Sequence, residues 1–398
     1  MHALLLLLVL LGPEQQTEPR LYDPPAVRVA TPAVALARDG QGVAMAWSMR
    51  TADRVSHIHI ARLDRFGQTG PIRELPVALT TGRTDAVHPS LSRRAGADGF
   101  LLTWIEERDG LSRAAYSLLD STLAPESPAL LPGVRLTSPA LAYTGAVMWV
   151  TSNGQFWEIE ANGAARGPFD AMWPASDITA PVTEVPFLVS GWRDPNVWTC
   201  DPASGCTIGS FPGIKVCKEE CRIRKSSLRL VMPYDVIETT LLDYRTEAEP
   251  AVESDGGKLV MAWFRGAQAT GGDVVAAIID PLTAPTFRSA IQAPLVLGRF
   301  GPDSGPTRPD IAVTERGTYV VWRTSSPGGD HDVAGALLRR DGTVEQFTVA
   351  ESEADERDPS ILALENGELL VAYVKIESGE SRIAWRVIGS QARRRVVR

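Results

Sequence analysis

Residues Arg308 to Gly342 form a unit that recurs along most of the chain. A proline opens an apolar stretch from Asp310 to Val313, a polar turn follows, and a second stretch from Thr318 ends on Trp322. A Gly-rich loop leads to a third apolar stretch, Val333 to Leu338, which an Asp-Gly turn closes. Runs of Val, Leu and aromatic residues between Gly, Pro and Asp are typical of β-strands and turns. The repeat therefore constrains the fold more than any other feature.

The second stretch of each unit is the clearest landmark, because it ends on an aromatic residue. The interval between Trp192 and Trp263 is the longest, and within it Leu230 to Tyr234 resembles Leu259 to Trp263, so we count eight units. No segment shows helical periodicity of any length. The other aromatic landmarks are Trp47, Trp104, Trp149, Trp322 and Tyr373.

Antiparallel strands that repeat every ~40–60 residues predict an all-β fold, a single β-propeller of packed four-stranded blades. The predicted propeller has eight units, of which the fifth is thin because Tyr234 and Trp263 lie close together; seven blades is the alternative. The last unit has no fourth strand after Ile388. We expect the N-terminal segment Ala26 to Ala30 to supply that strand and close the ring.

The unit combines P-x-x-A near the first strand, G-x-x-V-x-x-W in the second and D-x-x-G near the third. This layout, best preserved in Trp322 and in Asp332 to Leu338, resembles the degenerate repeats of large secreted bacterial surface proteins. The resemblance covers about residues 27 to 390. It implies an extracellular propeller but does not indicate any particular activity. Ser254 to Gly257 is superficially similar to the Asp-box of sialidases. It lies between a first and a second strand, however, and lacks the Thr-Trp end.

The first residues suggest export from the cytoplasm. The apolar run Ala3 to Leu11 is too short to span a bilayer and fits a signal peptide, here residues 1–18, although no Lys or Arg precedes it and no A-x-A site follows. A misplaced start codon or an N-terminal strand is the alternative. We expect the propeller to occupy residues 19–390 and a basic tail residues 391–398. The expected location is extracellular, on the cell surface or periplasmic.

Composition limits the classes of partner. The net charge is −8 and the pI about 5.3, which disfavours nucleic acid as a ligand. No later segment is apolar enough for stable membrane insertion.

Four cysteines lie within one short stretch, Cys200, Cys206, Cys217 and Cys221. Each successive pair flanks a turn, where neighbouring hairpin strands bring Cβ atoms close to disulfide distance. An even, local set in an exported protein favours disulfides. Zinc is the alternative, but only the second pair has the usual close spacing.

Cations follow the second-strand aromatic in several units, at Arg50, Arg193, Arg265, Arg323 and Lys375. They would lie on the face where the loops between second and third strands gather, and would suit an acidic ligand there. Neighbouring acids favour neutralising surface pairs instead. Those acids are Glu106, Glu107, Asp194 and Asp235.

The same loop position contains Asp330, His331 and Asp332. Three such groups can form a cation or ligand site, and ordinary turn chemistry is the alternative. His57 and His59 alternate on one strand and share a face. We expect that face to be solvated and not to bind metal, because no further ligand is predicted beside them.

No Ser-His-Asp order, phosphate loop or metalloprotease motif is present, so we predict no catalytic residues, metal or cofactor. The expected function is binding of a protein or glycan partner through one loop face. An enzyme of the glycosidase or lyase kind is one alternative, and two converging carboxylates would favour it. A structural module of a surface assembly is the other.

Overall fold

The computed structural model describes residues 20–22, 34–50, 54–64, 69–75, 84–109, 111–131, 140–143, 148–152, 155–170, 177–179, 187–199, 223–232, 235–242, 250–255, 258–267, 271–279, 293–301, 309–325 and 329–389. Every regular element in these ranges is a β-strand, so the fold is all-β. The described ranges contain no helix with the length and apolar character needed to cross a membrane.

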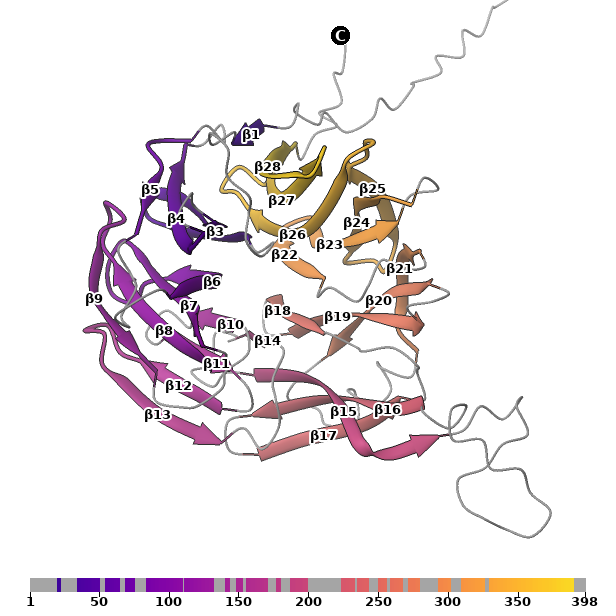
Figure 1. The fold of residues 1–398 in the computed structure, drawn as a ribbon. Helices are drawn as coiled ribbons and strands as arrows, with labels where there is room; N and C mark the ends of the chain where they lie inside the picture. The colour runs from indigo at the N-terminus through magenta and orange to yellow at the C-terminus, as the bar shows by residue number, and fades with distance from the viewer. Residues whose placement is uncertain are drawn as a thin grey trace, which may run out of the picture.

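The described strands form seven four-stranded antiparallel sheets (Figure 1). The first sheet has β2 (Val34–Asp39), β3 (Gly42–Arg50), β4 (Ser56–Leu63) and β5 (Arg73–Glu74). The second has β6 (Asp85–Arg93), β7 (Phe100–Arg108), β8 (Leu111–Leu119) and β9 (Pro125–Leu130). The third has β10 (Ala140–Tyr143), β11 (Met148–Ser152), β12 (Gln155–Ile159) and β13 (Ala165–Asp170).

The remaining sheets follow the same order. The fourth has β14 (Asp177–Thr179), β15 (Phe187–Thr199), β16 (Ile223–Met232) and β17 (Asp235–Leu242). The fifth has β18 (Ala251–Asp255), β19 (Lys258–Ala267), β20 (Gly271–Ile279) and β21 (Leu295–Phe300). The sixth has β22 (Asp310–Thr314), β23 (Gly317–Ser325), β24 (His331–Arg339) and β25 (Val344–Ala350). The seventh has β26 (Asp355–Ala363), β27 (Leu369–Glu377), β28 (Glu380–Ile388) and β1 (Arg20–Tyr22).

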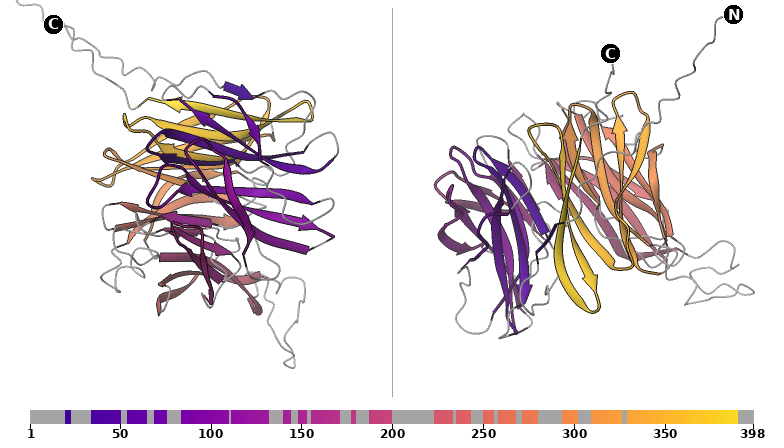
Figure 2. Two further views of the ribbon diagram at one scale, coloured as in Figure 1. Left: turned by 90° about the vertical axis from the view of Figure 1, so that its left-hand side faces the viewer. Right: turned by 90° about the horizontal axis from the view of Figure 1, so that it is seen from above.

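The first strands of the sheets contact one another in a cycle. β2 lies against β6, β6 against β10, and so on to β26, which lies against β2 again. Figures 1 and 2 show the sheets standing face to face around a common centre, with the first sheet beside the last. Contacts between sheets far apart in the sequence therefore close the arrangement.

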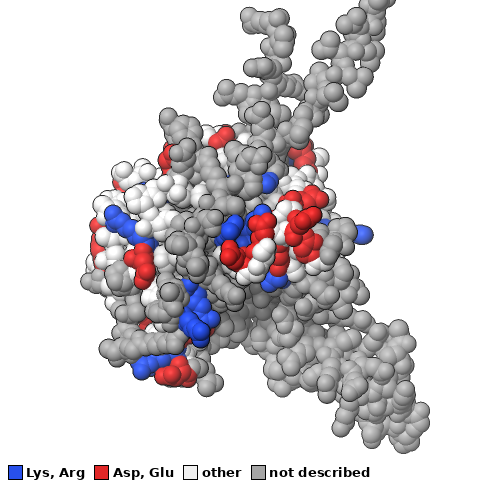
Figure 3. All heavy atoms as spheres, turned by 45° about the horizontal axis from the view of Figure 1, so that its top comes forward, with Lys and Arg blue, Asp and Glu red and all other residues white. Residues whose placement is uncertain are grey.

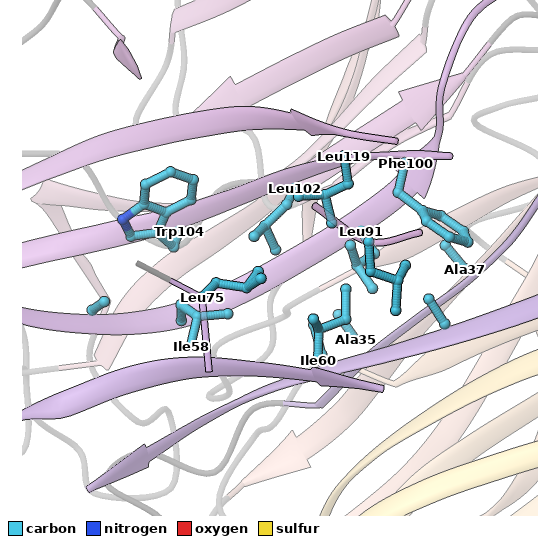
Figure 4. Close-up of a cluster of buried hydrophobic side chains, with 14 of the residues drawn as sticks. Ala35, Ala37, Ile58, Ile60, Leu75, Leu91, Phe100, Leu102, Trp104 and Leu119 are labelled. Atoms are coloured by element: carbon cyan, nitrogen blue, oxygen red, sulfur yellow. The ribbon is translucent and has the colours of Figure 1, made fainter. Parts of the chain in front are cut away.

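Apolar side chains between neighbouring sheets form the core. In Figure 4 Trp104 and Leu102 of the second sheet face Ile58 and Ile60 of the first. Trp47 packs in the same way against β27 and β28 of the last sheet. Burial on both faces explains why the second strands are almost continuously apolar instead of alternating.

The aromatic residues of the second strands are buried where the structure describes their side chains. The predicted strand end at the aromatic is wrong, because the strands continue beyond it, as β23 does from Trp322 to Ser325. Trp47, Trp104 and Trp263 have no exposed surface, and Trp322 is 2% exposed. Trp322 packs against Leu297 of the fifth sheet, and its indole N–H donates to the Arg299 carbonyl at 3.2 Å. These side chains therefore fill the space between sheets.

The count of eight units is wrong for the described residues. Leu230 to Met232 end β16, and Asp235 begins β17, so the segment assigned to an extra unit supplies the third and fourth strands of the fourth sheet. An apolar strand followed by a proline turn has the same pattern at any place in a sheet. The pattern alone therefore could not distinguish a second strand from a third.

The N-terminal contribution to the last sheet was predicted, but from different residues. Leu21 pairs with Ala384 and Tyr22 with Ile383, so Arg20–Tyr22 is the outer strand. The predicted segment, Ala26 to Ala30, lies outside the described residues. The proposed signal peptide, the basic tail and the four cysteines Cys200, Cys206, Cys217 and Cys221 also lie outside them.

Candidate functional site

Charged side chains gather where the sixth and seventh sheets meet on one face. This face, the loop face, carries the ends of the second strands β23 and β27, the starts of the third strands β24 and β28, and the start of β26. Antiparallel pairing of Thr324 with Asp332, and of Lys375 with Glu356, places these positions at the same end of their sheets. We call the group the charged cluster. It comprises Arg323, Asp330, His331, Asp332, Asp355, Glu356, Arg357, Asp358 and Lys375.

Asp355 joins the two sheets through its contact with His331 and is paired with Arg357 on its own strand. Its Oδ1 lies 2.8 Å from Nδ1 of His331 on β24, and its Oδ2 contacts Nη2 of Arg357 on β26. Burial opposes ionisation of Asp355, but the bonds to Arg357 and His331 outweigh it and hold the pKa of Asp355 below its usual value. The carboxylate is therefore a fixed negative charge between the sheets.

Asp358 lies next to this pair in an uncommon backbone conformation. Its φ is 49°, in the left-handed region, and the register between β26 and β27 shifts between Arg357 and Ser360. Burial raises the pKa of Asp358 to about 6, and the positive charges of Arg323 and Arg357 limit the rise. A left-handed non-Gly residue costs on the order of 1–3 kcal/mol and is enriched at functional sites.

The second sheet repeats this feature. His88 has φ 52° and precedes Pro89 as Asp358 precedes Pro359, with a register shift between Val87 and Ser90. Burial lowers the pKa of His88, and the Glu107 carboxylate opposes the change. Two titratable residues thus occupy equivalent positions on first strands, the strands nearest the centre of the molecule.

Asp332 and Glu356 are the most deeply buried acids of the charged cluster. Asp332 is 8% exposed and Glu356 is 2% exposed. Burial, with the charges of Asp330 and Glu351, raises the pKa of Asp332. Burial, with Asp332 and Asp330, raises the pKa of Glu356 to about 7 against the opposing effects of Ser352 and Lys375. Both carboxyls are covered by protein, so a ligand in solution would not reach them directly.

The cations predicted from the repeat occupy different surroundings. Arg265 pairs with Asp273 of β20 at 2.8 Å, and Lys375 Nζ lies 3.8 Å from Glu377. Burial lowers the pKa of Arg323, and the positive charge of Arg357 lowers it further. The negative charges of Asp358 and Asp355 oppose this change. Arg193 is part of β15. Of the predicted residues, the structure brings together Arg323, Asp330, His331, Asp332 and Lys375, and it places Arg265 on another sheet.

The loop face carries both signs of charge. In Figure 3 described Lys and Arg side chains lie beside Asp and Glu side chains at several places on the surface. The cations therefore stand beside carboxylates on this face.

The remaining members of the cluster were missed by sequence reasoning. Asp355, Glu356, Arg357 and Asp358 begin the first strand of the last sheet, before Pro359. A signal was present, since D-x-x-D-P-S at 355–360 matches D-x-x-H-P-S at 85–90. The repeated unit therefore begins several residues before its proline, and these additional residues include the missed members of the cluster.

His57 and His59 lie elsewhere, on β4, and both face Glu74 of β5. Their nearest nitrogens are 3.1 Å and 3.8 Å from its carboxylate. The expected solvated face is wrong for His59, which is 5% exposed and stacks on Trp47 at 6.0 Å. Burial accordingly lowers the pKa of His59. The described residues contain no group of three or more His, Cys, Asp or Glu side chains arranged to hold a metal ion.

Comparison with known proteins adds information on fold. No protein-family model and no curated protein matches the chain. A crystal structure of a protein of unknown function from Dyadobacter fermentans DSM 18053 matches with a TM-score of 0.53 and 11% identity, over 94% of this chain and 98% of that one. Trypanosoma rangeli sialidase, alone and in complex with sialic acid, matches with TM-scores of 0.44 and 0.45 at 7% and 8% identity. These matches cover 91% of this chain but only 54% and 59% of the sialidase chains.

Proposed function

We propose that the chain is a seven-bladed β-propeller that binds a protein or glycan partner through its loop face. The cyclic contacts of the first strands support the propeller, as does the packing of Trp47 against the last sheet. A propeller brings the loops of all its blades to a common face, which makes that face the natural place for a large ligand.

The observation that carries the binding function is the ion-paired state of the loop face. Arg265, His331 and Lys375 each lie within 4 Å of a carboxylate oxygen. Balanced surface charges favour selection of a partner with a complementary charge pattern over attraction of any acidic molecule. Within the charged cluster, Asp332 and Glu356 are too deeply buried to act on a polymer from solution.

Asp358 supports a second candidate, a hydrolase. Its raised pKa, near 6, would suit a general acid, and perturbed pKa values are common at active sites. The same shift follows from burial inside an ion-pair network, so binding remains our primary proposal.

Export is part of the proposal and has its own support in the sequence. The run Ala3 to Leu11 fits a signal peptide, and the local set of four cysteines fits disulfides formed outside the cytoplasm. A partner on the cell surface, in the periplasm or in the extracellular medium would then be within reach.

Charge reversal on opposite faces tests the binding function. One variant combines Arg108→Glu and Glu377→Lys, whose side chains are exposed on the loop face. The matched control combines Arg340→Glu and Glu365→Lys, exposed at turns on the other face. Each protein is assayed for binding on a glycan array and by quantitative cross-linking to surface proteins of the source cells.

We expect the loop-face variant to lose binding and the control to retain it. Equal binding by both variants would contradict the assignment of the face. Release of product from chromogenic glycosides, abolished by Asp358→Asn, would instead establish the hydrolase.

A further inference from the structure

We propose that Asp332 and Glu356 share one proton across the contact between the sixth and seventh sheets and so form a pH-sensitive clamp on the loop face. The inference is independent of the proposed binding function. It rests on how the two carboxyls are held, on what surrounds them and on the polar atoms left without partners.

One serine holds both carboxyls. The backbone N–H of Ser352 donates to Asp332, and its hydroxyl donates to Oε1 of Glu356 at 2.5 Å. Ser352 belongs to the segment between β25 and β26, and its Oγ also accepts from the N–H of Ala354 at 3.1 Å. Because the two donors belong to one small residue, the carboxyls are held side by side.

The second oxygen of each carboxyl is buried without a partner. Oδ1 of Asp332 and Oε2 of Glu356 make no hydrogen bond in the part of the chain that the structure describes. Leaving a buried acceptor unsatisfied is unfavourable, and more so if it is charged. In the proposed clamp a proton on one carboxyl is the missing donor, and a single proton would serve both atoms.

The surrounding charges favour the protonated form. Asp330 and Glu351 act on Asp332 as like charges, and His331 opposes them. Asp330 also acts on Glu356, and Lys375 of β27 is the cation that opposes it. Tyr373 of β27 lies close enough to Glu356 for their charges to interact, and it is hydrogen-bonded to Arg386 of β28. Two ionised carboxylates here would repel each other in a buried site, where His331 opposes the like charges on Asp332 and Lys375 those on Glu356. Like charges so placed cannot both ionise readily.

The consequence for stability follows from proton linkage. The folded protein keeps the proton of Glu356 up to a pKa of about 7, whereas the unfolded chain releases it near 4.5. A raised folded pKa stabilises the fold below the unfolded pKa, and this contribution is lost as pH rises to the folded pKa. The equilibrium constant for unfolding should therefore rise by about tenfold per pH unit within this window.

Comparing wild type with Glu356→Gln over pH isolates the clamp. Glutamine keeps the shape, accepts from Ser352 and donates an N–H to Asp332 without titrating. The matched control is Glu353→Gln, an exposed residue of the same segment. Unfolding is measured by denaturant titration from below pH 4.5 to above pH 7.

We expect the ratio of unfolding constants, wild type over Glu356→Gln, to rise by about tenfold per pH unit in that window and then level off. Wild type and the control should remain parallel. A ratio independent of pH would overturn the proposal. If Glu356→Gln does not fold, the carboxyl ¹³C resonance of Glu356 in wild type decides the question: a midpoint near 7 supports the shared proton, and one near 4.5 refutes it.

A cation could replace the proton, and this alternative has a separate outcome. Calcium is added to both proteins above neutral pH. If it stabilises wild type but not Glu356→Gln, the pair is a cation site and the shared proton is wrong. No selective effect supports the clamp.

Discussion

Trp322 and Gly298 make a contact between the fifth and sixth sheets that can be tested by a double-mutant cycle. A Cβ added at Gly298 would lie 2.5 Å from Cζ2 and 2.9 Å from Cη2 of the Trp322 indole. Trp322 is 2% exposed and cannot move away without disturbing its neighbours. The glycine is therefore required by the aromatic residue of the next sheet.

The expected energies follow from this geometry. Burying an aromatic side chain removes about 150–250 Å² from water, and Trp322→Ala should cost about 3–5 kcal/mol through lost transfer energy and a cavity. Gly298→Ala should cost about 1–3 kcal/mol through overpacking. In the double variant the new methyl group enters the space that the indole vacated. The double variant should therefore be more stable than the sum of the single effects predicts, by about 1–3 kcal/mol.

Equilibrium denaturation of the four proteins measures the coupling energy. Gly70→Ala is the control, since its Cβ would meet only the Arg62 carbonyl oxygen at 3.5 Å. It should change stability by less than about 0.5 kcal/mol. Additive effects of the two core substitutions would show that β21 and β23 are not packed as described, and the interlocking of the sheets would be refuted.

Three further predictions concern Asp358 and the cysteines. Asp358 has a folded pKa of about 6, above its ordinary value of 3.8, so its contribution to stability should fall as pH rises between these values; Asp358→Asn should remove this dependence in a denaturation series. Asp358→Ala should be less stable than Asp358→Asn by about 1 kcal/mol, because Asn accepts a left-handed backbone more readily. Thiol titration of the exported protein under denaturing, non-reducing conditions should find no reactive cysteine, and four reactive thiols or stoichiometric zinc would contradict the disulfides.

The sequence predicted the strands well because their signal is local. The aromatic of a second strand, such as Trp322, marks a buried position that a single unit displays. The number of sheets was harder to predict from the sequence. The apolar run before Pro233 belongs to a third strand, but its sequence would equally fit a second strand. Only pairing between strands distinguishes them, and pairing is not local.

The charged cluster was only partly predictable for a similar reason. Asp332 stood out as one of three ligand-type residues in a loop, but its partner Glu356 belongs to the next sheet. A polar residue within a strand is ordinarily expected to face solvent. Glu356 is buried instead, and its burial depends on packing between sheets that the sequence of a single repeat does not show.

Pairing of the N-terminal strand β1 with the last sheet supports the proposed propeller most directly, and an engineered disulfide tests this pairing. Leu21 and Ala384 are register partners across β1 and β28, and paired strand positions come close to disulfide distance. In Leu21→Cys/Ala384→Cys, peptide mapping by mass spectrometry under non-reducing conditions should find a bond between these residues in most molecules. The control Leu21→Cys/Arg386→Cys, two residues out of register, should form little. A new cysteine at position 21 that remains reduced in both proteins, or that prefers position 386, would contradict the pairing of β1 with β28 and remove this support for the proposed propeller.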